Sequence, residues 1–311
     1  MSTTYSALRA QLATLTTEAF RPELADIDRL PTAEIAALMN QEDQTVPAAV
    51  ARQLPAIAAA IDATAERMAR GGRLVYLGAG TAGRLGVLDA SECPPTFNTD
   101  PSEVVGLIAG GPSALVQAVE GAEDSKELAV ADLTALGLTA DDTVVGISAS
   151  GRTPYAVGAV EHARAHGALT IGLSCNADSA LAAAAEHGIE VVPGPELLTG
   201  STRLKAGTAQ KLVLNMISTI TMIRLGKTYG NLMVDVRASN EKLQARSRRI
   251  VALATGAPDE QIESALAAAD GEVKTAILML LADIDAKTAE ERLSDSRGHL
   301  RAALHATGPT A

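Results

Sequence analysis

The sequence contains very few aromatic residues and cysteines. Aromatic side chains make up 2% of its 311 residues, and tryptophan is missing altogether. The chain therefore has little material for stacking bases or sugar rings, and we expect a core of aliphatic side chains. The two cysteines, Cys93 and Cys175, cannot form a disulfide framework and are typical of a protein in a reducing compartment.

An excess of positive charge and long apolar segments are also missing. The formal net charge is -11 at pH 7. An acidic surface repels nucleic acids and anionic membranes, so we expect neither as a partner. No apolar stretch approaches the roughly 20 residues that span a bilayer. The N-terminal segment lacks a basic start followed by an apolar run, so we expect no signal peptide and a cytoplasmic location.

Short apolar segments rich in β-branched residues alternate with helical segments from Arg73 onwards. The predicted strands are RLVYLGA, EVVGLIA, TVVGIS, ALTIGLSC and IEVVP, with helices over 112–119, 125–135, 154–166 and 179–187. This alternation predicts an α/β fold in which a parallel sheet is flanked by helices in three layers. Ligands of such sheets bind beyond the carboxyl ends of the strands, so the loops there should carry the chemistry.

The chain divides into three predicted parts. Residues 1–45 contain an irregular arm followed by a helix. Residues 46–240 contain an Ala-rich helix that Pro55 should bend or restart, then the sheet, then a long helix from about 203 to 225. Residues 241–311 carry short helical segments that predict a small C-terminal helical domain.

A glycine-rich loop, GAGTAGR, joins the first predicted strand to a helix. Glycines such as Gly80 let backbone N–H groups approach an anion at the positive end of a helix, and Thr81 and Arg84 add a hydroxyl and a charge. The spacing G-x-G-x-x-G also occurs in dinucleotide-binding proteins. However, the next strand, EVVGLIAG, does not end in the acidic residue that would bind a ribose. The loop favours phosphate binding and leaves a dinucleotide as the alternative.

A second loop, SASGRTP, is the more specific signal. Ser148, Ser150, Gly151 and Thr153 lie between a strand and a helix with Pro154 in its first turn. Several hydroxyls beside the free N–H groups of a helix predict a phosphate-binding loop. An ordinary helix cap is the alternative, but it needs only one hydroxyl.

Two segments contain candidate catalytic carboxylates. In DASECPP, the two prolines are predicted to end a helix and place Glu92 at its terminus, where it fits a general acid or base. By itself, however, Glu92 is better explained as a solvated surface residue. In EGAEDS, Glu123 lies in an acidic turn, and Asp124 or Ser125 should cap the next helix. Glu123 is a candidate for a second carboxylate across a pocket from Glu92.

The segment TGSTRLKAG places hydroxyls and positive charge at the start of the long helix. Ser201 and Lys205 are candidates for anion contact, and a helix-capping loop is an equally good interpretation. The histidines are scattered, and the pair His162 and His166 lacks the carboxylate pattern of a zinc site. We therefore predict no metal site.

Several long motifs resemble those of one known family, and they occur in that family's order. They are GAGTAGRLGVLDASECPPTF, VEGAEDS, GISASGRTPYA, TGSTRLKAGTAQKLVLNMIST and GNLMVDVRASNEKL. Together they resemble the N-acetylmuramic acid 6-phosphate etherase family over nearly the whole chain. The family is related to glucokinase regulatory proteins and carries a sugar-isomerase (SIS) domain. The resemblance implies an SIS-type fold, a homodimer, a phosphorylated amino-sugar substrate, and no metal or organic cofactor.

The resemblance also implies roles for individual residues. Glu92 matches the acid/base residue, Glu123 matches a second active-site carboxylate, and the loop from Ser148 to Thr153 matches the 6-phosphate site. Family members usually have serine where this chain has Ala82. One hydroxyl donor is lost there, so we expect weaker substrate binding with the chemistry retained.

The implied reaction cleaves the D-lactyl ether of N-acetylmuramic acid 6-phosphate to give N-acetylglucosamine 6-phosphate and D-lactate. Proton abstraction at C2, elimination of lactate and addition of water would accomplish it. Two alternatives use the same fold. One is an aldose–ketose phosphosugar isomerase, and the other is a regulator that binds a phosphosugar without reacting.

Overall fold

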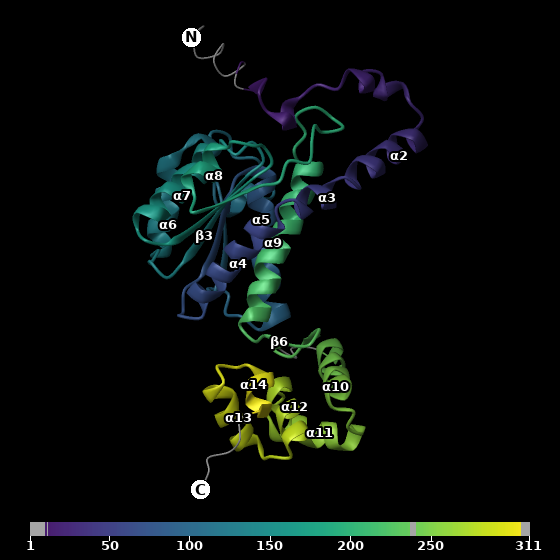
Figure 1. The fold of residues 1–311 in the computed structure, drawn as a ribbon, viewed down its shortest axis with the longest axis vertical. Helices are drawn as coiled ribbons and strands as arrows, with labels where there is room; N and C mark the ends of the chain where they lie inside the picture. The colour runs from purple at the N-terminus through teal and green to yellow at the C-terminus, as the bar shows by residue number, and fades with distance from the viewer. Residues whose placement is uncertain (1–9, 11, 237–240, 306–311) are drawn as a thin grey trace. The chain divides into compact units, whose positions relative to one another are not determined.

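The computed structural model describes residues 10, 12–236 and 241–305, and these form two compact units (Figure 1). The first unit contains the residues up to Ser91 together with Glu103–Ser218. The second contains Glu92–Ser102 and the residues from Thr219 onwards. No helix among the described residues is long and apolar enough to cross a membrane.

A parallel five-stranded sheet in the order β2-β1-β3-β4-β5 forms the centre of the first unit. Its strands are β1 (Leu74–Gly78), β2 (Val104–Ile108), β3 (Thr143–Ser148), β4 (Leu169–Ser174) and β5 (His187–Glu190). From β1 the chain crosses to β2 on one side, whereas β3, β4 and β5 follow on the other. In such sheets a crevice opens where the direction reverses, here beyond the carboxyl ends of β1 and β3.

Helices cover both faces of this sheet (Figure 1). One face carries α6 (Lys126–Leu136), α7 (Pro154–Ala165) and α8 (Ala180–Ala184), and the other carries α4 (Leu54–Met68), α5 (Gly80–Phe97) and α9 (Lys205–Arg224). Val75 and Leu77 pack toward α6 and α7, whereas the Tyr76 hydroxyl donates to Asp89 on α5 at 2.8 Å. Burial on both faces explains the continuous apolar strands and confirms the predicted α/β fold.

The N-terminal part of the first unit is a series of short elements. The 3-10 turns η1 (Thr16–Glu18), η2 (Pro22–Leu24) and η3 (Ile27–Arg29) precede α2 (Thr32–Asp43), α3 (Val46–Ala51) and α4. The helical segment is interrupted between α3, which ends at Ala51, and α4, which begins at Leu54. Pro55 lies in the first turn of α4, so the predicted restart of the helix is confirmed.

The second unit is helical apart from a short hairpin of β6 (Thr228–Tyr229) and β7 (Leu232–Met233). Its helices are α10 (Glu241–Thr255), α11 (Asp259–Ala268), α12 (Val273–Ala282), α13 (Ala286–Asp295) and α14 (Leu300–His305). The apolar residues of α12 are the most buried of these, and they pack against α10, α11, α13 and α14. Lys274 is only 7% exposed, and its ammonium is paired with Asp235 at 2.9 Å. These helices confirm the predicted small C-terminal helical unit.

Three predicted elements differ in the structure. The helix predicted over 112–119 is only the 3-10 turn η4 (Pro112–Leu115). Ala114 is buried, but Val116 and Val119 remain exposed, so a longer helix would have little apolar surface to bury. The helix predicted over 179–187 ends at Ala184, since Ala185 is extended and β5 begins at His187, earlier than the predicted strand.

The third difference concerns the prolines after Glu92. Helix α5 does not end before Pro94 but continues through it and Pro95 to Phe97. Each proline removes one backbone hydrogen bond, yet both lie in the last turn, and the Pro94 carbonyl still accepts the Asn98 N–H at 3.0 Å. Glu92 is therefore an exposed residue within the helix, and the predicted position at its terminus is wrong.

Candidate functional site

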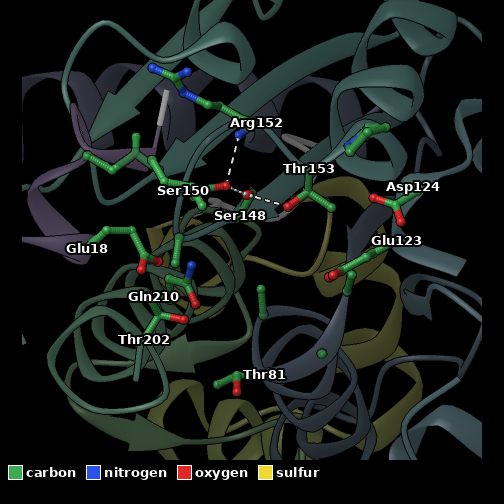
Figure 2. Close-up of a pocket in the computed structure, with 17 residues that line it drawn as sticks. Glu18, Thr81, Glu123, Asp124, Ser148, Ser150, Arg152, Thr153, Thr202 and Gln210 are labelled. Carbon is green, nitrogen blue, oxygen red and sulfur yellow. Dashed lines mark hydrogen bonds between the residues drawn. The ribbon is translucent and has the colours of Figure 1, made fainter. Parts of the chain in front are cut away.

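A pocket of about 540 Å³ opens in the first unit, beyond the carboxyl ends of β1 and β3 (Figure 2). Five parts of the chain line it: the N-terminal segment, the loop after β1, the turn η5 (Ala122–Asp124), the loop after β3, and the loop and helix of α9. Its polar or charged lining residues are Glu18, Thr81, Glu123, Asp124, Ser148, Ser150, Arg152, Thr153, Thr202 and Gln210.

The loop after β3 is organised around the Ser148 hydroxyl. Ser148 Oγ lies 2.8 Å from Thr153 Oγ1 and 3.2 Å from Ser150 Oγ, and it accepts the Gly151 N–H at 3.1 Å. Ser150 Oγ in turn accepts the Arg152 N–H at 3.2 Å. These bonds orient several hydroxyls and the start of α7 toward one pocket, as a bound oxyanion requires.

Gly151 makes this loop geometry accessible. Its φ is +68°, and a Cβ at this position would lie 2.4 Å from the Cβ of Ser179. A side chain is excluded both by the backbone conformation and by the close approach of a neighbouring segment. The structure therefore brings together Ser148, Ser150, Gly151 and Thr153, the four residues predicted for phosphate binding.

The loop after β1 contributes Gly80, Thr81 and Ala82 to the pocket. Helix α5 begins so close to β1 that a Cβ on Gly83 would lie 2.5 Å from the Gly78 carbonyl oxygen. This approach places the N-terminal N–H groups of α5, which have no helical acceptor, beside the pocket. The close approach of helix and strand requires glycine at position 83, so the glycine pattern of this loop does not by itself indicate a nucleotide site.

Arg84 does not line this pocket. Its Nε donates to the Leu115 carbonyl at 2.9 Å, and its Nη2 donates to the Ala114 carbonyl at 2.7 Å. The guanidinium thus connects α5 to the η4 turn. Among the described residues that line the pocket, Arg152 is the one with a positive charge, and it also donates to Thr14 Oγ1 at 3.4 Å.

The predicted carboxylates lie in different places. Glu123 and Asp124 line the pocket from η5, directly before α6. The Ser125 Oγ accepts the Leu128 N–H at 3.0 Å, so Ser125 provides the predicted cap. Glu92 is exposed on α5 and is not among the residues that line the pocket. Its catalytic role stays a prediction, as does that of Glu123.

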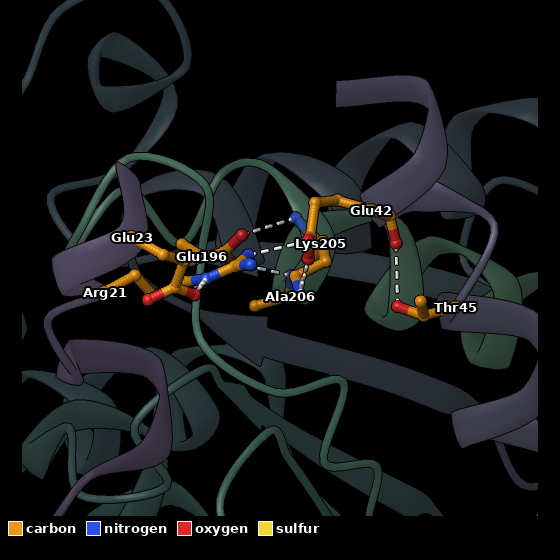
Figure 3. Close-up of polar contacts among 7 residues, drawn as sticks. All are labelled: Arg21, Glu23, Glu42, Thr45, Glu196, Lys205 and Ala206. Carbon is orange, nitrogen blue, oxygen red and sulfur yellow. Dashed lines mark hydrogen bonds and ion pairs between the residues drawn. The ribbon is translucent and has the colours of Figure 1, made fainter. Parts of the chain in front are cut away.

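Lys205, a candidate for anion contact, has other partners (Figure 3). Its ammonium lies 2.6 Å from Oε2 of Glu42, and its backbone N–H and that of Ala206 each donate to the Glu196 carboxylate at 2.9 Å. Burial raises the pKa of Glu196, although these N–H bonds oppose the rise. Neither Lys205 nor Ser201 lines the pocket, but Thr202 does. The N–H groups at the start of α9, which were candidates for binding an anion of the ligand, are therefore occupied by the carboxylate of Glu196.

Sequence reasoning missed two polar lining residues, Glu18 and Gln210. Glu18 follows an irregular segment whose pattern indicates nothing about its surroundings. Gln210 could have been found from the spacing of residues. Ala206 and Val213 are four residues before it and three after it, so the three share one helix face, which is buried. A polar residue on such a face is a candidate for the wall of a site. Within the part of the chain that the structure describes, no group of His, Cys, Asp and Glu side chains forms a metal-binding cluster.

Comparison with known proteins first identifies the class. Residues 56–164 match the family model of the glucokinase regulatory protein N-terminal SIS domain, and residues 118–220 match that of the SIS domain. Together with the parallel sheet and the pocket at its switch point, these matches define an SIS-domain protein and confirm the predicted fold type.

Full-length relatives then identify the family. The chain is 82% identical over 302 residues to an N-acetylmuramic acid 6-phosphate etherase of Streptomyces avermitilis, with 97% of each chain covered. It is 81% identical to the protein of that name in Streptomyces coelicolor, over 96% of each chain. With the Mycolicibacterium smegmatis protein it shares 57% identity over 95% of this chain and 99% of the relative. The chain belongs to the N-acetylmuramic acid 6-phosphate etherase family.

Proposed function

We propose that this protein cleaves the D-lactyl ether of N-acetylmuramic acid 6-phosphate, releasing N-acetylglucosamine 6-phosphate and D-lactate. The observation that carries the proposal is the identity of 82% and 81% to two etherases, over 97% and 96% of this chain. The pocket is consistent with it, because hydroxyl and backbone donors face carboxylates across one cavity.

The loop from Ser148 to Thr153 binds the 6-phosphate. Its hydroxyls are already oriented by hydrogen bonds within the loop, and Arg152 supplies positive charge in a protein of net negative charge. Thr81 and the first N–H groups of α5 add donors from the other loop. This binding energy acts far from the ether bond and holds the opened sugar chain in place.

The chemistry follows from the acidity of the carbon next to a carbonyl. Ring opening exposes the C1 aldehyde, and a carboxylate then removes the proton at C2. Lactate leaves from C3 with its electron pair while its oxygen receives a proton. Water adds across the resulting double bond, with hydroxide bonding to C3 and a proton to C2, so the balance is substrate and water to the two products.

Two carboxylates suit these proton transfers if one is ionised while the other is protonated. We assign the proton at C2 and the leaving oxygen to Glu92, by its match to the family's acid/base motif. Glu123, which lines the pocket, assists ring opening or the addition of water. No step in this scheme requires a metal or an organic cofactor.

The protein acts as a homodimer in the cytoplasm. Exposed apolar side chains around η4, including Val116 at 85% and Val119 at 42% exposure, support a second copy of the chain as a partner. The reducing compartment is supported by the two cysteines, which are buried and are not joined in a disulfide.

D-lactate release by the purified protein tests the proposed function. N-acetylmuramic acid 6-phosphate should give lactate, and the unphosphorylated sugar should give none. Turnover of glucosamine 6-phosphate to a ketose without lactate release would favour the isomerase. Binding of the phosphosugar with no turnover of either compound would favour the regulator.

A further inference from the structure

Gln210 lies in the wall of the pocket with an unused hydrogen-bond donor. The residue is 1% exposed, yet it lines the cavity. Within the described part of the chain, its Nε2 atom has no hydrogen-bond partner. Figure 2 shows its amide pointing into the pocket, on the side of Glu18 and Thr202, with Glu123 and Asp124 on the opposite side.

This arrangement is unfavourable for the free protein. A buried N–H group without an acceptor loses its bonds to water and gains nothing in return. The apolar residues Ala206, Ala209 and Val213 are buried close to Gln210 on α9, so an aliphatic side chain would fit the wall. The presence of a buried glutamine where an aliphatic side chain would fit needs an explanation. A ligand that accepts a hydrogen bond from its amide provides one.

The charges in the pocket indicate which group of the ligand accepts. The lactyl carboxylate is disfavoured beside Gln210, because Glu18 contributes a negative charge on the same side. Sugar hydroxyls can donate as well as accept, so the pocket's carboxylates satisfy them without an amide. An amide carbonyl can only accept, and carboxylates cannot satisfy it.

We propose that Gln210 recognises the 2-acetamido group of the substrate, its Nε2–H donating to the acetyl carbonyl oxygen. This inference rests on the proposed function, which supplies an N-acetylated sugar phosphate as the ligand. Glu18, on the same side of the pocket, is placed to accept the acetamido N–H. Gln210 is then a specificity residue that separates N-acetylated from free amino sugars and takes no part in the proton transfers.

A binding experiment with two matched ligands tests this role. N-acetylglucosamine 6-phosphate and glucosamine 6-phosphate differ in the acetyl group, whose absence leaves a positively charged amine. Calorimetry measures the affinity of the wild type and of each variant for both ligands. The Gln210→Met variant should bind the N-acetylated sugar about tenfold more weakly. Its affinity for glucosamine 6-phosphate should change less than about twofold. Gln210→Glu replaces the hydrogen-bond donor by an acceptor. It should also weaken binding of the N-acetylated sugar selectively, and by a larger factor than Gln210→Met.

Thr208→Ala serves as the control on the same helix, since the Thr208 hydroxyl is exposed and donates only to the Leu204 carbonyl. It should change neither affinity. The melting temperature of Gln210→Met should equal or exceed that of the wild type, because an unpaired buried donor has been removed. A lower melting temperature of Gln210→Met, together with an equal loss of affinity for both ligands, would show that Gln210 has a structural role and would overturn the proposal.

Unchanged affinity for the N-acetylated sugar in both Gln210 variants would also overturn it. The proposed function fails separately, if the wild-type protein releases no lactate from N-acetylmuramic acid 6-phosphate. The binding comparison uses no turnover and therefore decides the role of Gln210 in either case.

Discussion

The ammonium of Lys205 lies 2.6 Å from the carboxylate of Glu42, and the Lys205 residue is only 3% exposed. The other oxygen of Glu42 lies 2.6 Å from the Arg21 guanidinium. One carboxylate thereby joins the N-terminal segment and α2 to the start of α9 (Figure 3). Because Glu18 and Gln210 line the pocket from the joined segments, these ion pairs help to fix the shape of the pocket wall.

Replacing Glu42 with glutamine should destabilise the first unit. Lys205 would keep its charge in a buried position without its 2.6 Å carboxylate partner, and breaking such a pair costs about 3 kcal/mol. Urea unfolding at pH 7 measures the change in the free energy of unfolding. Glu263→Gln is the control, because it breaks an exposed pair with Arg248 and should have little effect. Equal stabilities of Glu42→Gln and wild type would contradict the prediction.

The same pair makes stability depend on acid pH. Burial by itself would raise the pKa of Glu42, but hydrogen bonds from Lys205 and Arg21 outweigh it and hold the pKa below its ordinary value. A depressed folded-state pKa contributes stability above the unfolded-state pKa, and this contribution is lost as the pH falls through the folded value. The difference in melting temperature between wild type and Glu42→Gln should therefore shrink below about pH 4. A constant difference from pH 7 to pH 3 would contradict it.

Replacing either candidate carboxylate should abolish turnover without unfolding the protein. Glu92→Gln and Glu123→Gln each remove a proton-transfer group, so lactate release should fall at least about 100-fold. Glu120→Gln is the matched control, since Glu120 is exposed near the same turn as Glu123 and does not line the pocket. Circular dichroism should show the same fold in all three variants. Full activity of Glu92→Gln would end its assignment as the acid/base residue.

Removing the central hydroxyl of the Ser148–Thr153 loop should weaken substrate binding. Ser148→Ala deletes a hydrogen-bond partner of Ser150, Gly151 and Thr153 at once. We expect KM to rise about tenfold, with a smaller change in kcat, because the phosphate lies far from the reacting bond. Ser113→Ala, at an exposed site on η4, should leave both constants unchanged. A fall in kcat at constant KM would argue against phosphate binding by this loop.

Restoring the usual family serine should improve binding. Ala82 lines the pocket and is 6% exposed, so a hydroxyl at this position has few acceptors other than the ligand. Ala82→Ser should lower KM by about threefold, as expected for one added hydrogen bond. Steady-state kinetics with N-acetylmuramic acid 6-phosphate measures it. An unchanged or higher KM would show that the ligand makes no use of a donor there.

The sequence by itself determined the sheet and the two loops at its carboxyl edge. Strands buried on both faces require continuous apolar runs, and these are visible without any knowledge of long-range contacts. The loop residues Ser148, Ser150, Gly151 and Thr153 are close in sequence, so their shared hydrogen bonds follow from local geometry. The cap at Ser125 was predictable for the same reason.

Only the tertiary structure decided the partners of the long polar side chains. Lys205 meets Glu42 across 163 residues of sequence, and Arg84 meets the carbonyls of a turn 30 residues away. Glu18 lines the pocket although its segment shows no periodic pattern. A flexible charged side chain can reach many acceptors, and which one it contacts depends on how distant segments pack. Residue type alone therefore indicated that Lys205 and Arg84 bind something negative, and the fold determined that their partners belong to the protein.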